Sequence, residues 1–392
     1  MPLSLYLLAM AVFAMGTSEF MLAGLLPDLA ADLDVAVGTA GTLTSAFAVG
    51  MVVGAPLVAA LARNWPRRSS LAGFILAFAA AHGVGAVTSS FPVLFATRVV
   101  AALAYAGFLA VALTAAATLV PASRKGRALA VLLSGTTVAT IAGVPGGSAL
   151  GAVLGWRAAF WAVAALCLPA ALCVVKAVPA GRAMEEAPGG PGLRAELAQL
   201  ARRPLLLVML LGALVNAATF GSFTFLAPVV TDTAGLGELW ISVALVLFGA
   251  GSLVGITVAG RLSDRRPGLI VAVGGPLLLI GWPALAVLVH EPVILFALVF
   301  MQGALSFALG STLITRVLYE AAEAPTMAGA YATAALNVGA AVGPLIAATA
   351  LSTPAGNLGP LWASGLMVAI ALLIVLPFRA VVTAGRSAEA LR

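Results

Sequence analysis

The sequence predicts an all-α polytopic membrane protein with twelve transmembrane helices in two pseudo-symmetric six-helix bundles. Three observations indicate this fold class: the composition, the length of the apolar segments, and the placement of basic residues between them. Hydrophobic residues make up 62% of the chain and charged residues only 9%, whereas about a quarter of the residues in a soluble globular domain are charged. Most of the chain is therefore expected to lie in lipid.

The apolar residues fall into long segments that match the thickness of a bilayer. An α-helix rises about 1.5 Å per residue and needs roughly 20 residues to cross about 30 Å of hydrocarbon. We expect the helices, in chain order, at residues 4–26, 39–62, 70–89, 92–119, 128–151, 158–178, 205–228, 239–262, 268–289, 293–318, 326–351 and 359–379.

Basic residues alternate between the gaps that separate these helices. Eighteen of the 20 lie in every second gap or at the chain end, and the intervening gaps carry acids such as Asp28, Asp232 and Glu291. Loops rich in Lys and Arg remain on the cytoplasmic side of a membrane. The pattern therefore predicts a multi-pass protein of the cytoplasmic (inner) membrane with both termini in the cytoplasm.

The composition also argues against other function classes. A net charge of +6, dispersed over separate loops, fits contact with anionic lipid headgroups better than nucleic-acid binding. Cys167 and Cys173 lie on opposing faces of one helix, and His82 and His290 have no metal-ligand spacing, so neither a disulfide, a metal nor a cofactor is expected. No nucleophile motif, phosphate loop or repeated filter sequence supports an enzyme or a channel.

The chain divides into two halves that resemble each other. A polar segment at 179–204 is expected to be a cytoplasmic linker between six-helix bundles at 1–178 and 205–392. Pro27 has a counterpart 201 positions later in Pro228. Pro145 has one 199 positions later in Pro344. Such a duplication predicts a pathway between the halves, an arrangement that suits a transporter.

A run of glycine and proline lies in the fifth predicted helix: Gly143, Pro145, Gly146 and Gly147. Small residues let helix backbones approach closely, and Pro removes one helical hydrogen bond. With this run, the chain resembles the drug:proton antiporters of the major facilitator superfamily, in which it is the antiporter motif. The resemblance implies the twelve-helix major facilitator fold and transport by alternating access. A tight helix contact with no role in antiport is the alternative.

The loops that follow the second and eighth helices carry a second feature of this superfamily. Asp264 and Arg265 match its cytoplasmic loop motif. The first-half copy departs from the motif, since Arg63 replaces the usual Asp, although Arg67 and Arg68 are kept. In the family the loop Asp helps to hold the cytoplasmic gate shut, whereas Arg63 places the opposite charge at that position.

A compensation between opposite loops would explain this departure. If pseudo-symmetry holds, Asp264 approaches Arg127 at the start of the fifth helix, where a carboxylate also gains from the positive helix N-terminus. By the same operation Arg63 approaches Glu320 and Glu323 before the eleventh helix. We expect two latches of opposite polarity at the cytoplasmic gate. Solvated loop charges without a gating role are the alternative.

Glu19 is the expected proton carrier. It lies eight residues before Pro27, roughly 12 Å from the outer surface, and ionisable residues at such depth usually face a cavity or a partner. Arg98 in the fourth helix, at about 10 Å depth, is the expected partner and matches an arginine of the superfamily's fourth-helix motif. The pair is expected to alternate between an ion pair and a protonated state that engages substrate. A purely structural pair is the alternative.

Aromatic and amide side chains on the predicted cavity helices suggest a binding site for a small amphipathic molecule. A mostly apolar cavity with a few orienting polar groups suits such a ligand. Taken singly, each aromatic residue could instead serve helix packing or lipid contact. The candidates are Tyr105, Phe108, Asn216, Phe220, Phe223, Gln302, Phe307, Tyr331 and Asn337.

Longer runs resemble one branch of the superfamily, the actinobacterial chloramphenicol resistance exporters. These runs are GTSEFMLAGLLPD, LTSAFAVGMVVGAPL, YAGFLAVAL, GVPGG, GSTLITRVLY and YATAALNVGAAVGP. The resemblance implies proton-coupled efflux of chloramphenicol or a related phenicol. Separately, a single chain is expected to be the functional unit. Export of sugars or other metabolites is the alternative, although the predicted cavity helices carry few hydrogen-bonding side chains.

Overall fold

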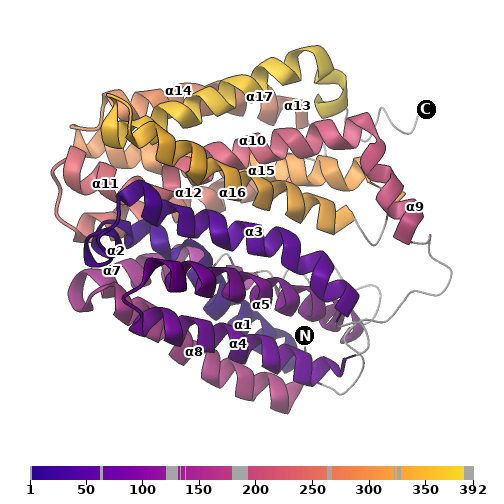
Figure 1. Cartoon of the computed structure of the whole chain (residues 1–392). Coiled ribbons are helices and arrows are strands. Elements are labelled where there is room, and N and C mark those ends of the chain that lie inside the picture. Colours follow the sequence, from indigo (N-terminus) through magenta and orange to yellow (C-terminus); the bar gives the residue numbers. More distant parts are fainter. Residues whose placement is uncertain are drawn as a thin grey trace. The chain divides into compact units, whose positions relative to one another are not determined.

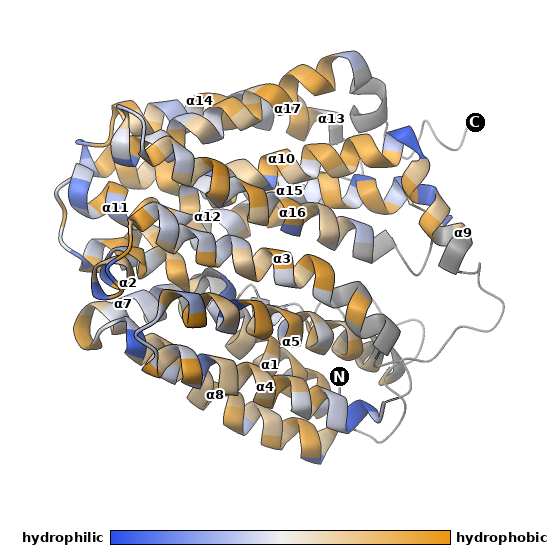
Figure 2. Ribbon diagram, in the orientation of Figure 1, coloured by the Kyte–Doolittle hydropathy of each residue, from blue (hydrophilic) through white to orange (hydrophobic). Residues whose placement is uncertain are grey.

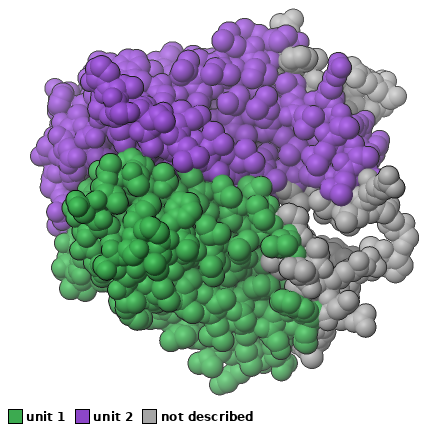
Figure 3. All heavy atoms as spheres, viewed as in Figure 1, with its two compact units in different colours: residues 1–188 green, residues 189–392 purple. Residues whose placement is uncertain are grey.

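The computed structural model describes residues 2–61, 65–120, 131–132, 134–136, 138–178, 193–262, 267–321, 323–324 and 328–383. The described residues form helices joined by short turns (Figure 1). Contacts divide the chain into two compact units, residues Met1–Pro188 and Gly189–Arg392, which Figure 3 shows in separate colours. The division falls inside the segment for which the sequence predicts a linker.

Unit 1 contains the elements up to Pro188. The first predicted helix is divided in three, with a 3₁₀ turn before Pro27, and a π-helical turn precedes the helix that begins near Pro145. The elements are α1 (Leu3–Phe20), η1 (Met21–Gly24), α2 (Leu26–Asp32), α3 (Val37–Leu61), α4 (Arg67–Val87), α5 (Phe91–Thr118), η3 (Ala139–Gly143), α7 (Val144–Leu154) and α8 (Trp156–Ala177).

Unit 2 repeats much of this order. The elements are α9 (Leu193–Ala198), η4 (Gln199–Ala201), α10 (Arg203–Thr224), α11 (Leu226–Pro228), η5 (Val229–Thr233), α12 (Leu239–Leu262), α13 (Pro267–Leu269), η6 (Ile270–Gly274), α14 (Gly275–Val287), α15 (Pro292–Glu320), α16 (Ala328–Leu351), η7 (Gly356–Leu358) and α17 (Gly359–Thr383).

The structure interrupts several helices that the sequence predicts to be continuous, and most of these interruptions lie next to a proline. Its ring blocks the hydrogen bond that residue i would donate to the carbonyl of i−4, so the helix must tighten, widen or restart there. Pro27 and Pro145 each lie in the first turn of a new helix. Pro276 follows the π-helical turn η6 in the same way.

Ten helices in the described part of the chain are long and apolar enough to cross a membrane, and Leu3–Glu19 adds a shorter apolar helix. Figure 2 shows that hydrophobic residues cover the lengths of these helices, while hydrophilic residues gather near their ends. Large apolar side chains such as Leu172, Val293 and Leu373 are exposed. Lipid is the solvent for which such a surface is suited, so the chain forms a multi-pass membrane protein.

Close approach of helix backbones holds each unit together. A Cβ added at Gly135 would collide with the carbonyl oxygen of Ala9 on α1, and one at Gly343 would collide with that of Ala217 on α10. Small residues thus bring the helical residues 134–136 against α1 in unit 1, and α16 against α10 in unit 2. In lipid, where apolar burial cannot drive helix association, such packing is the main source of cohesion.

Candidate functional site

A buried arginine lies at the centre of a polar cluster in unit 1. The side chain of Arg98 on α5 is only 1% exposed. Its Nη1 donates to the hydroxyl of Ser18 at 2.6 Å, and its Nη2 donates to the carbonyl oxygen of Ser18 at 2.9 Å. The guanidinium also lies 4.5 Å from the ring centroid of Phe47, a cation–π contact. Both terminal nitrogens of Arg98 are therefore held by one residue of α1.

A histidine extends this cluster to α4. His82 Nε2 lies 2.5 Å from the hydroxyl of Ser18, and its Nδ1 lies 2.9 Å from the carbonyl oxygen of Phe78. The imidazole is stacked on the ring of Phe78 at 4.3 Å and lies 5.6 Å from that of Phe160. Only 2% of His82 is exposed. The sequence assigned His82 no role, because a single histidine in an apolar segment gives no spacing signal.

Glu19 is adjacent to Ser18 and only partly buried. Its charge interacts electrostatically with that of Arg98. Among the described residues Glu19 forms no direct ion pair with Arg98, whose terminal nitrogens bind Ser18 instead. The structure thus brings the two predicted partners near each other and inserts Ser18 as the direct ligand of the guanidinium. Their role in proton coupling stays a prediction.

Tyr105, a predicted substrate residue, belongs to the same region. Its ring packs near those of Phe47 and Phe78, at centroid distances of 6.3 and 6.2 Å. Its hydroxyl hydrogen-bonds with Thr136. Phe108, one turn further along α5, is completely buried.

The predicted antiporter motif packs beside this cluster. A Cβ at Gly143 would collide with the hydroxyl of Thr17, which precedes Ser18 on α1. Gly147 faces Met21 of η1, whereas Gly146 is exposed and Pro145 is buried. The small residue at 143 therefore determines how closely η3 approaches the part of α1 that carries Ser18 and Glu19.

Aromatic residues of unit 2 form a second cluster. The ring centroid of Phe223 on α10 lies 6.4 Å from that of Phe220 and 4.8 Å from that of Phe248 on α12. Phe248 in turn contacts Phe307 on α15 at 6.2 Å. Three predicted substrate residues thus lie together, joined by Phe248, which the sequence pattern did not single out. The helical spacing on α10 predicted that Phe220 and Phe223 lie on one face. The contribution of Phe248 on α12 became evident only from the packing of the helices.

The predicted amide ligands are mostly engaged with neighbouring backbone. Asn216 Nδ2 donates to the carbonyl oxygen of Leu336 at 2.7 Å, and Gln302 Nε2 donates to that of Leu278 at 3.2 Å. Asn337 Nδ2 bonds within its own helix at 3.0 Å. Tyr331 is buried. Asn216 and Gln302 therefore contribute bonds between helices of unit 2.

Four predicted gate residues, Arg63, Arg127, Asp264 and Arg265, lie outside the described residues. Arg67 is buried, and Arg68 Nε donates to the carbonyl oxygen of Val178 at 2.9 Å. Glu320 pairs with the buried Arg316 at 3.0 Å, and Glu323 pairs with Arg202 at 3.3 Å. Both acids proposed to face Arg63 thus have basic partners within unit 2.

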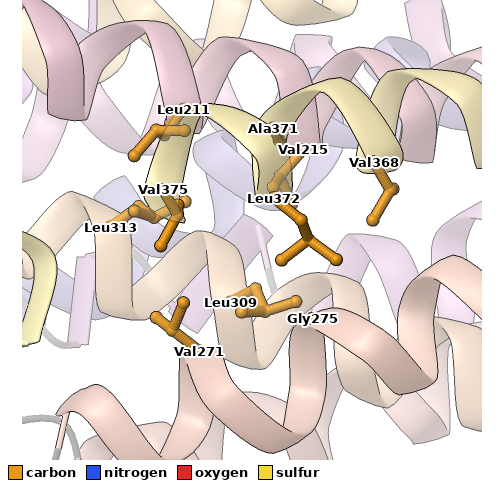
Figure 4. Close-up of a pocket in the computed structure, with 10 residues that line it drawn as sticks. All are labelled: Leu211, Val215, Val271, Gly275, Leu309, Leu313, Val368, Ala371, Leu372 and Val375. Atoms are coloured by element: carbon orange, nitrogen blue, oxygen red, sulfur yellow. The ribbon is translucent and has the colours of Figure 1, made fainter. Parts of the chain in front are cut away.

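A small cavity of about 20 Å³ lies among α10, α14, α15 and α17 of unit 2 (Figure 4). Drug-sized ligands occupy pockets of roughly 300 Å³ or more that also carry orienting polar groups. This cavity is too small and exclusively apolar, so it is a packing defect rather than a drug site. Its lining residues are Leu211, Val215, Val271, Gly275, Leu309, Leu313, Val368, Ala371, Leu372 and Val375.

The sequence profile of the Major Facilitator Superfamily matches residues 8–344. The chain belongs to the major facilitator superfamily. Within this superfamily it is 78% identical to the chloramphenicol resistance protein of Streptomyces lividans over 392 residues, the full length of both chains. It is 31% identical to the inner membrane transport protein YdhP of Escherichia coli over 368 residues, 94% of each chain.

A solved structure of the same fold is a bacterial homologue of the human lysosomal transporter Spinster, in an inward-facing and unoccupied conformation. It superposes with a TM-score of 0.74 and 17% identity, covering 95% of this chain and 94% of the other. Membership of the major facilitator superfamily makes the chain a membrane transporter. The superfamily does not specify the cargo or the residues that handle it.

Proposed function

We propose that this chain is a proton-coupled exporter of chloramphenicol or a related phenicol that works by alternating access. The observation that carries the coupling is a partly buried carboxylate, Glu19, that interacts electrostatically with the fully buried Arg98 inside an apolar helical unit. Charges at such positions are costly and are usually kept for function. The identity to the Streptomyces lividans protein over the full length supports the choice of substrate.

The proposal includes the arrangement in the membrane. Twelve spans would form six-helix halves at 1–178 and 205–392, with both termini in the cytoplasm and a single chain as the working unit. The alternation of basic loops supports this orientation. The recurrence of Pro27 and Pro145 as Pro228 and Pro344, about 200 positions later, supports the duplication.

Coupling would require that Glu19 binds a proton on one side of the membrane and releases it on the other. Arg98 favours the ionised carboxylate, while the surrounding apolar helices favour the neutral form. Glu19 could then be either ionised or protonated, and the drug and the proton would compete for binding to the transporter. The aromatic cluster of Phe220, Phe223 and Phe307 would supply the apolar surface for the phenicol ring.

Two measurements test this function. Cells that express the chain should survive chloramphenicol and florfenicol, and a protonophore should abolish the protection. In inverted vesicles, Glu19→Gln should abolish drug uptake driven by a proton gradient. The matched control is Glu291→Gln, the same chemical change at an exposed residue. Uptake by Glu19→Gln at the level of the control would reject Glu19 as the coupling residue.

A further inference from the structure

We propose that His82 is a positioning residue for coupling: through the hydroxyl of Ser18 it holds the guanidinium of Arg98 beside Glu19 without letting the two charges pair directly. The inference rests on the proposed function of Glu19 and Arg98. It adds a residue on α4 to a mechanism that otherwise involves α1 and α5.

The hydrogen bonds determine which atom of His82 carries a proton. The carbonyl oxygen of Phe78 can only accept, so Nδ1 at 2.9 Å must donate. Ser18 Oγ already accepts from Arg98 Nη1. In the described part of the chain the hydroxyl has one other partner, His82 Nε2 at 2.5 Å, so its hydrogen must be donated there. His82 is therefore the neutral tautomer with Nε2 as acceptor.

The result is a directed chain of bonds from Arg98 to Ser18 to His82 to Phe78. Each hydroxyl and ring nitrogen in this chain has a partner, and removal of the acceptor at Nε2 would leave the Ser18 hydrogen unpaired in a buried place. The ring of His82 cannot readily turn away, because Phe78 stacks on it at 4.3 Å and Phe160 lies at 5.6 Å. The imidazole thus fixes the rotamer and the direction of the Ser18 hydroxyl.

The hydrogen bonds between Ser18 and Arg98 also affect Glu19, the residue next to Ser18. Both terminal nitrogens of Arg98 are engaged by Ser18, whereas Arg98 Nε has no hydrogen-bond partner within the described chain. If Ser18 lost its fixed direction, the guanidinium would be free to turn towards the nearby carboxylate. A direct buried ion pair would hold Glu19 ionised and hinder its proton loading.

Unit 2 shows that the helix packing does not itself require this polar chain. In unit 2, α14 packs against α15 and α17 as α4 packs against α5 and α8 in unit 1. At the offset of 201 residues that relates Pro27 to Pro228, Ser18 corresponds to Thr219, and 200 residues after His82 and Arg98 lie Trp282 and Leu298. Trp282 has no acceptor nitrogen and Leu298 has no guanidinium, so these residues cannot repeat the chain of bonds. The polar network is thus confined to the unit that carries Glu19.

The test compares two amides at position 82 in the full-length chain, reconstituted in liposomes with labelled chloramphenicol. His82→Gln can present an acceptor near the place of Nε2, whereas His82→Asn reaches only the place of Nδ1. We expect His82→Asn and Ser18→Ala to lower uptake driven by a proton gradient about tenfold, and His82→Gln to stay within about twofold of the parent. Drug exchange without a gradient should stay within about twofold of the parent for all three.

Measuring gradient-driven uptake and gradient-free drug exchange separately distinguishes a positioning role from a merely structural one. A role in folding alone would lower gradient-driven uptake and exchange together, and that outcome would overturn the proposal. Full gradient-driven uptake by Ser18→Ala would also overturn it, and this smaller substitution keeps the test valid if His82→Asn folds poorly. The double variant of Ser18→Ala and His82→Asn should be no worse than either single variant, because both break one chain.

Glu19→Gln, measured in parallel, separates this inference from the proposed function. If Glu19→Gln abolishes gradient-driven uptake while His82→Asn and Ser18→Ala preserve it, the inference on His82 alone fails. If Glu19→Gln itself preserves that uptake, the proposed coupling residue is wrong and the inference falls with it.

Discussion

Arg157 at the start of α8 forms an ion pair with Asp32 at the end of α2, with Nη1 and Oδ2 separated by 2.5 Å. The guanidinium also donates to the carbonyl oxygen of Thr88 and lies 4.4 Å from the ring of Trp156. In unit 2, Asn357 Nδ2 donates to Asp232 Oδ2 at 3.3 Å. Both partners lie 200 positions after their counterparts, so the duplicated contact is ionic in one unit and has only one charge in the other.

The ionic contact should contribute to stability in a salt-dependent way. Because Arg157 and Asp32 are partly exposed, a double-mutant cycle of Arg157→Ala and Asp32→Ala should give a coupling of about 0.5–1 kcal/mol. High salt should reduce that coupling, whereas the cycle of Asn357→Ala and Asp232→Ala should change little. Unfolding of the purified protein in detergent measures both cycles. Additive effects at positions 32 and 157 would contradict a direct interaction.

Because Gly143 lies close to Thr17 of α1, replacement of Gly143 by alanine should lower both stability and transport. Gly143→Ala forces a Cβ into the hydroxyl of Thr17, and overpacking of this kind typically costs about 1–3 kcal/mol. The displaced segment carries Ser18 and Glu19, so gradient-driven uptake should fall along with stability. Gly73→Ala is the control, because no atom of the described residues lies within 4 Å of a Cβ at that position.

A second substitution tells whether that collision is the cause. Thr17→Ala removes the hydroxyl and the methyl group nearest to position 143, so it should restore much of the uptake of Gly143→Ala. At Gly343, 200 positions after Gly143, the obstacle is the backbone of Ala217. No side-chain change at 217 should relieve Gly343→Ala. Failure of Thr17→Ala to rescue would point to a cause other than the collision.

A buried serine pair should stabilise unit 2. Ser222 Oγ donates to Ser364 Oγ at 2.8 Å, and Ser364 Oγ donates to the carbonyl oxygen of Ala218 at 2.6 Å. Ser364→Ala removes two bonds and should lower the free energy of unfolding by about 1 kcal/mol. Ser222→Ala loses the bond to Ser364 and only a long contact of 3.4 Å with the carbonyl oxygen of Pro360, keeps the bond from Ser364 to Ala218, and should cost less. Thermal unfolding in detergent compares them, and equal costs would contradict this order.

The aromatic cluster of unit 2 should determine drug affinity under the proposed function. Phe223→Ala removes the ring that contacts both Phe220 and Phe248, and we expect the KM for chloramphenicol to rise about tenfold with little change in exchange at saturation. Phe296→Ala, which alters an aromatic pair with Trp240 instead, is the control. An equal rise of KM in both variants would show that the loss of any ring on these helices has the same effect.

Much of the fold follows from the chain as a linear pattern. Apolar length, the alternation of basic gaps and the repeat at about 200 residues depend only on the order of residues, because lipid imposes one length and one polarity on every span. The sequence also indicated that Glu19 and Arg98 belong together. It did not indicate the breaks at η1, η3 and η6, since a proline can end, bend or restart a helix according to what packs beside it.

What the sequence by itself determined is the class of protein, its multi-pass helical character and the rare charges within its apolar segments. Only the tertiary structure decided which polar atoms meet. Ser18 is 64 residues from His82 and 80 from Arg98, and their contact depends on how α1, α4 and α5 are rotated about their axes. The amides of Asn216 and Gln302, which the sequence predicts as substrate ligands, donate to backbone carbonyls of neighbouring helices. Packing sets the rotation of each helix about its axis, and the hydropathy along the chain does not predict that packing.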